Sequence, residues 1–373
     1  MSALIVLAAG GTGGHLFPAE ALARELMGRG FRVALVTDRR GQAFGDKLPG
    51  VTLHRIRAGR IGAGLVSKVV GIAELALGTL EAGRLLRALA PAAAVGFGGY
   101  PSVPTMLAAA RQDLPTVIHE QNAILGRANR LLAPRVRWIA TAFAEVGGLR
   151  ESDLPRVMFT GNPVRPAIAA LRSTPYRAPE ADGAFDILVL GGSQGARVLS
   201  EVIPAAFAAL PEALRRRLRV TQQARAEDLE AVRRAHRASG VAAELAPFFN
   251  DVPERLARAH LVISRAGAST MAELQMVGRP AILVPYLHAA DDHQTANARA
   301  LEKAGGAWVM PQASFTAAAL AQALQALIAA PEQLVRAAIA AHAQGRPDAA
   351  RVLADLVVAA VGNGHPLPRE NAA

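Results

Sequence analysis

The sequence predicts an α/β protein in which two domains are each built on a parallel sheet. The chain has 373 residues, long enough for two domains of about 100–200 residues each. Strand-like apolar runs alternate with helix-like segments throughout, which is typical of parallel strands joined by right-handed crossovers. A strand, a glycine-rich turn and a helix follow one another near residue 4 and again near residue 187, which indicates two such units.

Short apolar runs bounded by glycine, proline or polar residues predict the strands, and longer runs with helical spacing predict the helices. In the first half we expect strands at 4–8, 32–36, 93–96, 116–119 and 138–141, with helices near 18–28, 66–89, 103–111 and 125–132. In the second half we expect strands at 186–190, 219–222, 243–246, 261–264 and 281–284, with helices between them. The domain boundary is expected near 161–166 or in the polar stretch 173–184.

The composition excludes several protein classes. With 51% hydrophobic and 19% charged residues the chain is not disordered, and without cysteine it has no disulfide, thiolate metal site or cysteine nucleophile. The net charge of +11 favours an acidic partner such as nucleic acid, an anionic membrane or a phosphorylated substrate. A general bias toward arginine is the alternative, because only three basic residues are lysines. Aromatic residues make up 4%, so we expect no nucleic-acid partner.

Membrane features are weak in the sequence. The N-terminus lacks the basic region of a signal peptide, and no run of about 20 strongly apolar residues predicts a membrane span. Residues 65–89 are apolar on most sides, which is typical of a buried helix and is our expectation. The alternative is a surface helix that contacts lipid with arginines at its rim.

The first glycine turn is Gly10-Gly11-Thr12-Gly13-Gly14-His15. Glycines after a strand let a phosphate or sugar approach the backbone, and the helix that follows favours negative charge there. The turn matches neither the dinucleotide fingerprint nor a Walker A loop. His15 is placed to act as a base on a ligand, while a tight turn with a structural histidine is the alternative.

The second half carries two comparable turns. Residues 191–196 can hold a diphosphate through backbone N–H groups and the Ser193 hydroxyl, although Ser193 as a helix cap is the alternative. After the strand at 261–264, Glu273 can accept hydrogen bonds from paired ribose hydroxyls, or form a capping box with Thr270. Polar residues also end other strands, at 119–122 and 288–294, which indicates one shared polar cleft between two Rossmann-like domains. We do not expect a metal at 291–293, since adjacent carboxylates on a loop are usually solvated.

Six motifs together resemble one family, the bacterial peptidoglycan glycosyltransferases that form lipid II (undecaprenyldiphospho-muramoylpentapeptide beta-N-acetylglucosaminyltransferases). The motifs are Gly10–His15, Gly98-Gly99-Tyr100, His119-Glu120-Gln121-Asn122, Gly161-Asn162-Pro163-Val164-Arg165, Gly191-Gly192-Ser193-Gln194-Gly195-Ala196, and Gly267-Ala268-Ser269-Thr270 with Glu273. They occur in the family's order at about its spacing, between residues 4 and 351.

The resemblance implies the glycosyltransferase B fold and a metal-independent, inverting reaction without a cofactor. The donor would be UDP-N-acetylglucosamine and the acceptor lipid I, whose muramoyl 4-hydroxyl attacks the anomeric carbon. Residues 1–163, with a helix at about 345–362 packing back on them, would form the acceptor and membrane domain, and residues 164–344 the UDP-sugar domain. The protein would be attached peripherally to an anionic membrane surface, the cytoplasmic face of the bacterial inner membrane.

The resemblance also implies the residues of the site. Those that would hold the donor are Arg165, Ser193, Phe249 (through its backbone), Ala268, Ser269, Thr270, Met271, Ala272, Glu273 and Gln294, with Thr12, Gly13, Gly14 and Asn122 from the other half. His15 is the expected base and Glu120 the second choice. Because the loop before it is one residue longer than in some members, His293 is the alternative to Gln294. Residues 221–225 depart from the family pattern and receive no role.

Three other functions stay open. A non-hydrolysing UDP-sugar 2-epimerase has the same fold and would convert the UDP-sugar without an acceptor. Another glycosyltransferase of this fold would use a different hydroxyl. A non-catalytic membrane or nucleic-acid binder would explain the charge but leave the glycine turns without a purpose.

Overall fold

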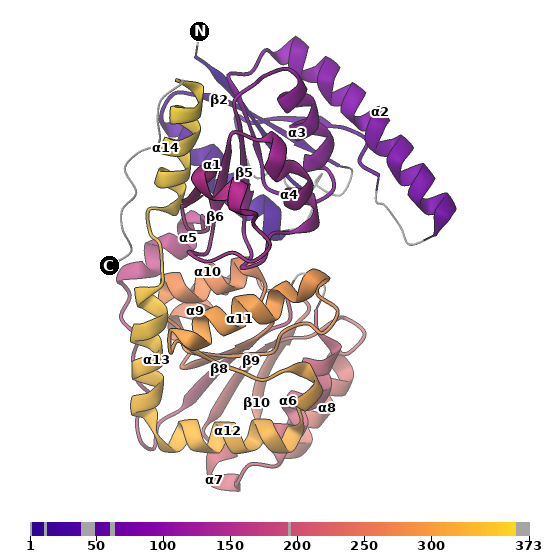
Figure 1. The fold of residues 1–373 in the computed structure, drawn as a ribbon. Coiled ribbons are helices and arrows are strands. Elements are labelled where there is room, and N and C mark those ends of the chain that lie inside the picture. Colours follow the sequence, from indigo (N-terminus) through magenta and orange to yellow (C-terminus); the bar gives the residue numbers. More distant parts are fainter. Residues whose placement is uncertain (1, 11–12, 39–48, 60–63, 193–194, 363–373) are drawn as a thin grey trace. The chain divides into compact units, whose positions relative to one another are not determined.

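The computed structural model describes residues 2–10, 13–38, 49–59, 64–192 and 195–362 (Figure 1). These residues form two compact units. The first lies within Met1–Arg165 and Arg346–Ala373, and the second is Pro166–Gly345. Each unit holds one parallel sheet with helices on both faces, which confirms the predicted α/β class.

The sheet of the first unit has the order β3-β2-β1-β4-β5-β6-β7, and all its pairs are parallel. The strands are β1 (Leu4–Ala8), β2 (Arg32–Thr37), β3 (Thr52–Arg55), β4 (Ala93–Gly96), β5 (Thr116–Glu120), β6 (Trp138–Thr141) and β7 (Val157–Phe159). The helices are α1 (Gly13–Gly28), α2 (Leu65–Leu89), α3 (Ser102–Arg111), α4 (Arg127–Leu132) and α14 (Ala349–Val361), with 3-10 turns at Ala133–Arg135 and Glu151–Arg156. Strands β2 and β3 are added on one side of β1, and strands β4 to β7 on the other, so the order of the sheet reverses between β1 and β4.

Alternate residues of the central strands serve two apolar layers. Ile5 and Leu7 of β1 pack under α1 and α14, while Leu4 and Val6 face α2, α3 and α4. Helix α14 lies along α1 (Figure 1), and the Arg29 guanidinium donates a 2.6 Å hydrogen bond to the Asp355 carboxylate between them. Helix α14 is therefore an integral part of the first unit.

The sheet of the second unit has the order β10-β9-β8-β11-β12-β13, again all parallel. The strands are β8 (Phe185–Leu190), β9 (Leu218–Gln223), β10 (Ala242–Ala246), β11 (Leu261–Ser264), β12 (Ala281–Leu283) and β13 (Ala307–Val309). The helices are α5 (Pro166–Ala169), α6 (Arg197–Ala208), α7 (Glu212–Arg215), α8 (Leu229–Ser239), α9 (Val252–Arg258), α10 (Ala268–Val277), α11 (His293–Lys303), α12 (Ala317–Ala329) and α13 (Pro331–Ala343), with 3-10 turns at Ala170–Ser173, Ala290–Asp292 and Gln312–Ser314. Ile187 and Val189 of β8 belong to the apolar layer under α6 and α12.

Three strands were not expected from the sequence: β3, β7 and β13. All three lie at a sheet edge. An edge strand buries only part of its surface, so it needs no continuous apolar run, and each of these has four residues or fewer. The helix expected near 18–28 begins earlier, at Gly13. Glycine has a low helix propensity, but here the two glycines open the first turn of a helix whose inner side is buried on the sheet.

The expectation that residues 65–89 form a buried helix is wrong. Helix α2 packs on α3 through one side, where Ala82 and Leu86 are buried. Its other side presents apolar side chains to solvent: Val70, Ile72, Leu77 and Leu80 are 45–59% exposed. In the part of the chain that the structure describes, no helix is long and apolar enough to cross a membrane.

Candidate active site

In the first unit, the turn after β1 meets the turn after β4, where the sheet reverses its order. The Gly10 N–H donates a 3.1 Å hydrogen bond to the Gly98 carbonyl oxygen. Ligands of open α/β sheets bind at such a reversal. His15, in the first turn of α1, lies at this point.

Gly98 and Gly99 make room for the His15 ring. Their φ angles are +84° and +74°, which side chains rarely allow, and a Cβ atom on either would come within 3.2–3.4 Å of an imidazole carbon. The motif Gly98-Gly99-Tyr100 therefore forms one wall of the histidine's site.

Two buried side chains, Gln121 and His119, connect His15 to the interior of the unit through close polar contacts. The His15 Nδ1 atom lies 3.1 Å from Oε1 of Gln121, and Nε2 of Gln121 lies 3.0 Å from Nδ1 of His119. The His119 Nε2 atom in turn lies 3.0 Å from the carbonyl oxygen of Gly161. Burial lowers the pKa of His119 to about 4, so this imidazole is neutral near pH 7.

The Glu120 carboxylate organises the loop that follows β5. Its Oε1 accepts hydrogen bonds from the backbone and side-chain amides of Asn122, at 3.0 and 3.1 Å. Its Oε2 accepts from the Gly126 N–H at 2.8 Å and from the Asn129 amide at 2.9 Å. The side chain is buried, and four neutral donors occupy its oxygens.

The other expected residues of the first unit surround the start of α1. No described heavy atom lies within 4 Å of a Cβ built on Gly14, whereas one on Gly13 would touch the Phe17 ring at 3.0 Å. The Arg165 guanidinium lies over the same ring, 4.6 Å from its centre. Beyond the neighbouring backbone of α1 itself, nothing described crowds this side of Gly14. Thr12 lies outside the described residues.

In the second unit, the turn after β8 is held by Gln223, to which we gave no role. Its Oε1 accepts from the Gly191 N–H at 3.2 Å, and its Nε2 donates to the carbonyl oxygens of Gly192 and Pro247, at 3.4 and 3.1 Å. The glutamine joins the glycine turn to the segment that precedes Phe249. Ser193 lies outside the described residues.

The Phe249 side chain is already occupied. The Arg255 guanidinium stacks over its ring at 4.1 Å and makes two hydrogen bonds of 2.6 and 2.7 Å to the Glu244 carboxylate. That guanidinium lowers the pKa of Glu244, so the pair stays ionised near neutral pH. The Phe249 ring is therefore engaged within the second unit, and its role toward a ligand stays a prediction.

Helix α10 carries the expected donor residues Ala268, Ser269, Thr270, Met271, Ala272 and Glu273. Met271 and Ala272 are buried, while Ser269 and Thr270 in the first turn are half-exposed. Glu273 is 8% exposed, one turn further along the helix. The expected donor residues thus occupy the first six positions of a ten-residue helix.

Helix α11 fixes the segment just before α10. The Gln294 Oε1 accepts from the backbone N–H groups of Ala266, at 3.3 Å, and Tyr286, at 3.0 Å. Asn297, one turn later, donates a 3.1 Å hydrogen bond to the Ala266 carbonyl oxygen. His293 instead bonds its own turn, with Nδ1 2.7 Å from the Ala290 carbonyl oxygen. Of the two alternatives, Gln294 bonds the segment before α10 and His293 bonds its own turn, while their roles toward the donor stay a prediction.

Asp291 and Asp292, which precede α11, are exposed and have φ angles of 53° and 51°. Among the described residues, no group of three histidines or carboxylates stands close enough to hold a metal ion.

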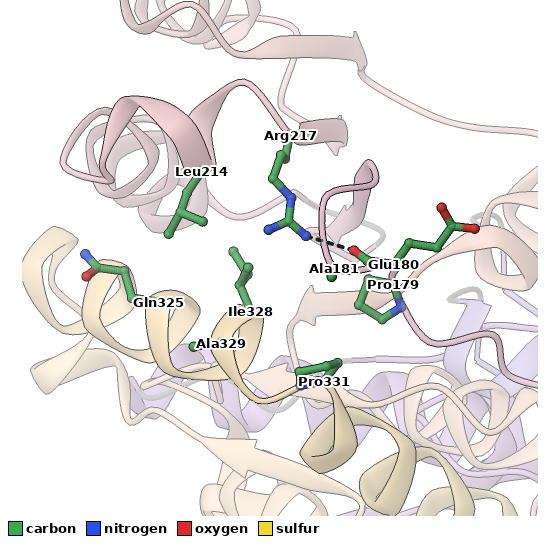
Figure 2. Close-up of a pocket in the computed structure, with 9 residues that line it drawn as sticks. All are labelled: Pro179, Glu180, Ala181, Leu214, Arg217, Gln325, Ile328, Ala329 and Pro331. Atoms are coloured by element: carbon green, nitrogen blue, oxygen red, sulfur yellow. Dashed lines mark hydrogen bonds between the residues drawn. The ribbon is translucent and has the colours of Figure 1, made fainter.

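A separate cavity lies at the other end of the same sheet, next to the amino ends of β8 and β9 (Figure 2). It measures about 280 Å³ and is lined by Pro179, Glu180, Ala181, Leu214, Arg217, Gln325, Ile328, Ala329 and Pro331. Arg217 donates to the backbone carbonyl oxygens of Gly183 and Glu180 across its rim. None of the expected site residues lines it, so it is not the candidate active site.

Four side chains that shape the two sites had no predicted role: Gln121, Asn129, Gln223 and Asn297. All are amides that bond backbone or other side chains. The only sequence signal for two of them is their position. Gln121 lies in the polar segment at the end of a strand, and Asn297 lies one helical turn after Gln294.

Comparisons with known proteins identify the family of the chain. Residues 5–141 match the glycosyltransferase family 28 N-terminal domain, and residues 186–353 match the glycosyltransferase family 28 C-terminal domain. The chain is 63% identical over 361 residues to a protein of Rhodospirillum centenum named UDP-N-acetylglucosamine–N-acetylmuramyl-(pentapeptide) pyrophosphoryl-undecaprenol N-acetylglucosamine transferase. That match covers 97% of this chain and 95% of the relative.

Solved structures show the same architecture. MurG from Acinetobacter baumannii has a TM-score of 0.78 and 28% sequence identity, over 95% of this chain and 99% of that one. A UDP-GlcNAc 2-epimerase from Neisseria meningitidis has a TM-score of 0.64 and 13% identity, over 96% and 100% of the two chains. The second likeness shows a shared fold alone.

Proposed function

The chain belongs to glycosyltransferase family 28, and we propose from this membership that it transfers N-acetylglucosamine from UDP-N-acetylglucosamine to lipid I and so forms lipid II. The observation that carries the proposal is the 63% identity, over 97% of the chain, to a relative named for this transfer. The fold is the glycosyltransferase B fold that the motifs predict. The epimerase alternative is supported by the fold alone.

His15 is the base in this mechanism. As the muramoyl 4-hydroxyl oxygen attacks the anomeric carbon, the imidazole takes the hydroxyl proton. The bond from that carbon to the diphosphate of UDP breaks, and the configuration inverts. A positioned base of this kind contributes about 10²–10⁴ in rate. The place of His15 at the sheet reversal, beside the open side of Gly14, supports this role.

Glu120 is the weaker candidate for the base. Four N–H donors hold its oxygens, so a proton arriving there would have to displace one of them. We assign Glu120 to the shape of the loop from 120 to 126, which also sets the position of Asn122.

The donor binds against the second unit in this proposal. Glu273 accepts the ribose hydroxyls, and the segment from Ala268 to Ala272 lines the nucleotide with Gln294 and the Phe249 backbone. The negative charge that develops on the departing diphosphate is stabilised by backbone N–H groups at the start of a helix. Gly13, Gly14, Thr12, Ser193 and Arg165 complete the set, with the Arg165 guanidinium supplying a cation.

The first unit docks on an anionic membrane surface through α2 in this proposal. The exposed side chains Val70, Leu77 and Leu80 share one side of the helix with Arg84 and Arg87, which are exposed too. Glu81 lies one helical turn after Leu77, at the edge of this side, and pairs with Arg57. An apolar stripe rimmed by arginines suits a lipid surface with negative headgroups, as at the cytoplasmic face of the inner membrane.

Release of UDP from UDP-N-acetylglucosamine, with and without a lipid I analogue, tests the function. We expect release only when the acceptor is present, with a disaccharide product. Conversion of the UDP-sugar to its 2-epimer without acceptor would establish the epimerase instead. No turnover and no donor binding would point to a non-catalytic protein.

A further inference from the structure

A chain of hydrogen bonds leads from His15 through two buried side chains to one backbone carbonyl. From its geometry we propose that Gln121 and His119 are positioning residues, which hold His15 in the tautomer with the proton on Nδ1 and the lone pair on Nε2. This inference rests on the role of His15 as the base in the proposed function. It goes further by naming the nitrogen that takes the proton and the residues that select it.

The series of hydrogen bonds ends at the carbonyl oxygen of Gly161, which fixes the direction of all the others. A carbonyl oxygen only accepts, so the His119 Nε2 atom, 3.0 Å away, carries the hydrogen. Gly161 itself is held in place, because its N–H donates a 3.1 Å hydrogen bond to the Thr141 carbonyl oxygen. Its φ angle is +78°, and a Cβ atom there would lie 2.6 Å from the Arg346 side chain.

His119 then has one remaining nitrogen, Nδ1. The imidazole is fully buried beside the Phe97 ring and neutral near pH 7, so Nδ1 has no hydrogen and accepts. Its neighbour must be a donor.

Gln121 supplies that donor, and its orientation is settled by a second contact. The amide nitrogen lies 3.0 Å from Nδ1 of His119 and 2.8 Å from the His119 carbonyl oxygen. Both partners accept, which matches the two hydrogens of the amide. The flipped amide would place an oxygen 2.8 Å from another oxygen, so only one orientation satisfies the site.

The amide oxygen of Gln121 consequently faces His15. It can only accept, so the His15 Nδ1 atom, 3.1 Å away, carries the hydrogen. A neutral imidazole has a single N–H, and the lone pair is therefore on Nε2. A free histidine side chain favours the opposite tautomer, so the protein must enforce this one.

The neutral partner has a consequence of its own. A carboxylate next to Nδ1 would select the same tautomer but would also stabilise the charged imidazolium and raise the pKa of the histidine. An amide selects the tautomer without that charge. The hydrogen bond to Gln121 thus selects the tautomer with the lone pair on Nε2.

The tautomer can be measured without any substrate. In protein labelled with ¹⁵N at its histidines, long-range ¹H–¹⁵N correlations at pH 8 distinguish protonated from unprotonated ring nitrogens, and His15→Gln identifies the His15 signals. We expect Nδ1 of His15 to be protonated in the wild type. In Gln121→Met, which removes the amide at nearly constant volume, we expect the Nε2-protonated form to predominate.

A matched control removes a different amide of the same unit. Gln112 donates a 2.9 Å hydrogen bond to the Gly83 carbonyl oxygen, away from His15, and Gln112→Met should leave the His15 tautomer unchanged. With a lipid I analogue, Gln121→Met should lower kcat by roughly tenfold or more, with the donor KM within about twofold of the wild type.

Two results would overturn the proposal: an Nε2-protonated His15 in the wild type, or an unchanged tautomer in folded Gln121→Met. The wild-type spectrum decides the question even if the variant does not fold. Failure of the proposed function would look different. The wild type would then release no UDP with any acceptor, while the Nδ1-protonated signal of His15 would still be present.

Discussion

The side-chain amide of Asn129 donates a 2.9 Å hydrogen bond to Oε2 of Glu120 and a 3.2 Å hydrogen bond to the carbonyl oxygen of His119. One residue of α4 thus holds both the carboxylate and the backbone at the end of β5. Two neighbouring residues of the motif at 119–122 have different roles. Glu120 shapes the loop, and Gln121 orients His15.

Replacement of Glu120 by glutamine separates these roles. The new amide nitrogen must face either the two Asn122 donors or the donors of Gly126 and Asn129, so two donors lose their acceptor. We expect a loss of about 1–3 kcal/mol in the free energy of unfolding, measured by urea denaturation. Asn129→Ala should show a loss of similar size. A stable Glu120→Gln protein whose kcat falls more than about a hundredfold would make Glu120 the base instead.

Replacement of His15 by alanine tests the base directly. We expect kcat to fall by about 10²–10⁴, with little change in the KM for UDP-N-acetylglucosamine, because the imidazole acts on the attacking hydroxyl and not on the donor. Steady-state UDP release with a soluble lipid I analogue measures both constants. A loss of less than about tenfold would remove His15 from the mechanism.

Glu273→Gln should act on binding. Glutamine keeps the shape but has one oxygen in place of the two of a carboxylate, so it grips a pair of ribose hydroxyls less well. We expect the donor KM to rise more than kcat falls. The reverse pattern in the same assay would move Glu273 from nucleotide binding into the chemical step.

The exposed side of α2 is open to a membrane test. The double variant Val70→Glu, Leu80→Glu replaces two side chains that are 54% and 59% exposed and should abolish sedimentation with vesicles that contain phosphatidylglycerol. Ile339→Glu on α13, 65% exposed, is the matched control and should sediment like the wild type. Sedimentation that does not change with salt concentration would contradict the electrostatic part of the proposal.

The buried histidines give the protein a predictable pH dependence. Burial lowers the pKa of His119 and His236 to about 4, below the usual 6.5. Between these two pKa values the histidines bind protons in the unfolded state but not in the folded state. The free energy of unfolding therefore falls as the pH drops from about 6.5 toward 4. Each group contributes a slope of up to about 1.4 kcal/mol per pH unit. Urea denaturation at pH 7 and pH 5 should show a smaller difference in His236→Gln than in the wild type. In the variant of the exposed His288, His288→Gln, the difference should be unchanged.

The sequence predicts the centre of the fold better than its edges. The inner strands are continuous apolar runs because helices cover both faces. The bounds of β1 and β11 were predicted to the residue, and those of β2, β5 and β8 to within one residue. The edge strands β3, β7 and β13 bury less and carry no such run. For helix α2 an apolar sequence predicted burial, but several of its apolar side chains are exposed to solvent.

The glycine turns were likewise visible in the sequence, since a strand followed by glycines and a helix is a local pattern. The hydrogen bonds among His15, Gln121, His119 and Gly161 were not, because they join positions up to 106 residues apart. Neutral amides have no charge pattern or periodicity that would single them out. Their roles depend on which atoms the fold brings to within about 3 Å of one another, and only the structure shows this.

The packing of α14 on α1 has a consequence for how the protein is made. Leu22 and Leu26 of α1 lie in the apolar layer with Leu353 and Val357 of α14, so the first unit has an uncovered apolar surface until the end of the chain has been synthesised. The second unit is one continuous stretch, Pro166–Gly345, and has all its strands before α14 leaves the ribosome. We therefore expect the order of folding in the cell to reverse the order of the sequence, with the later unit maturing first and the amino-terminal one closing last.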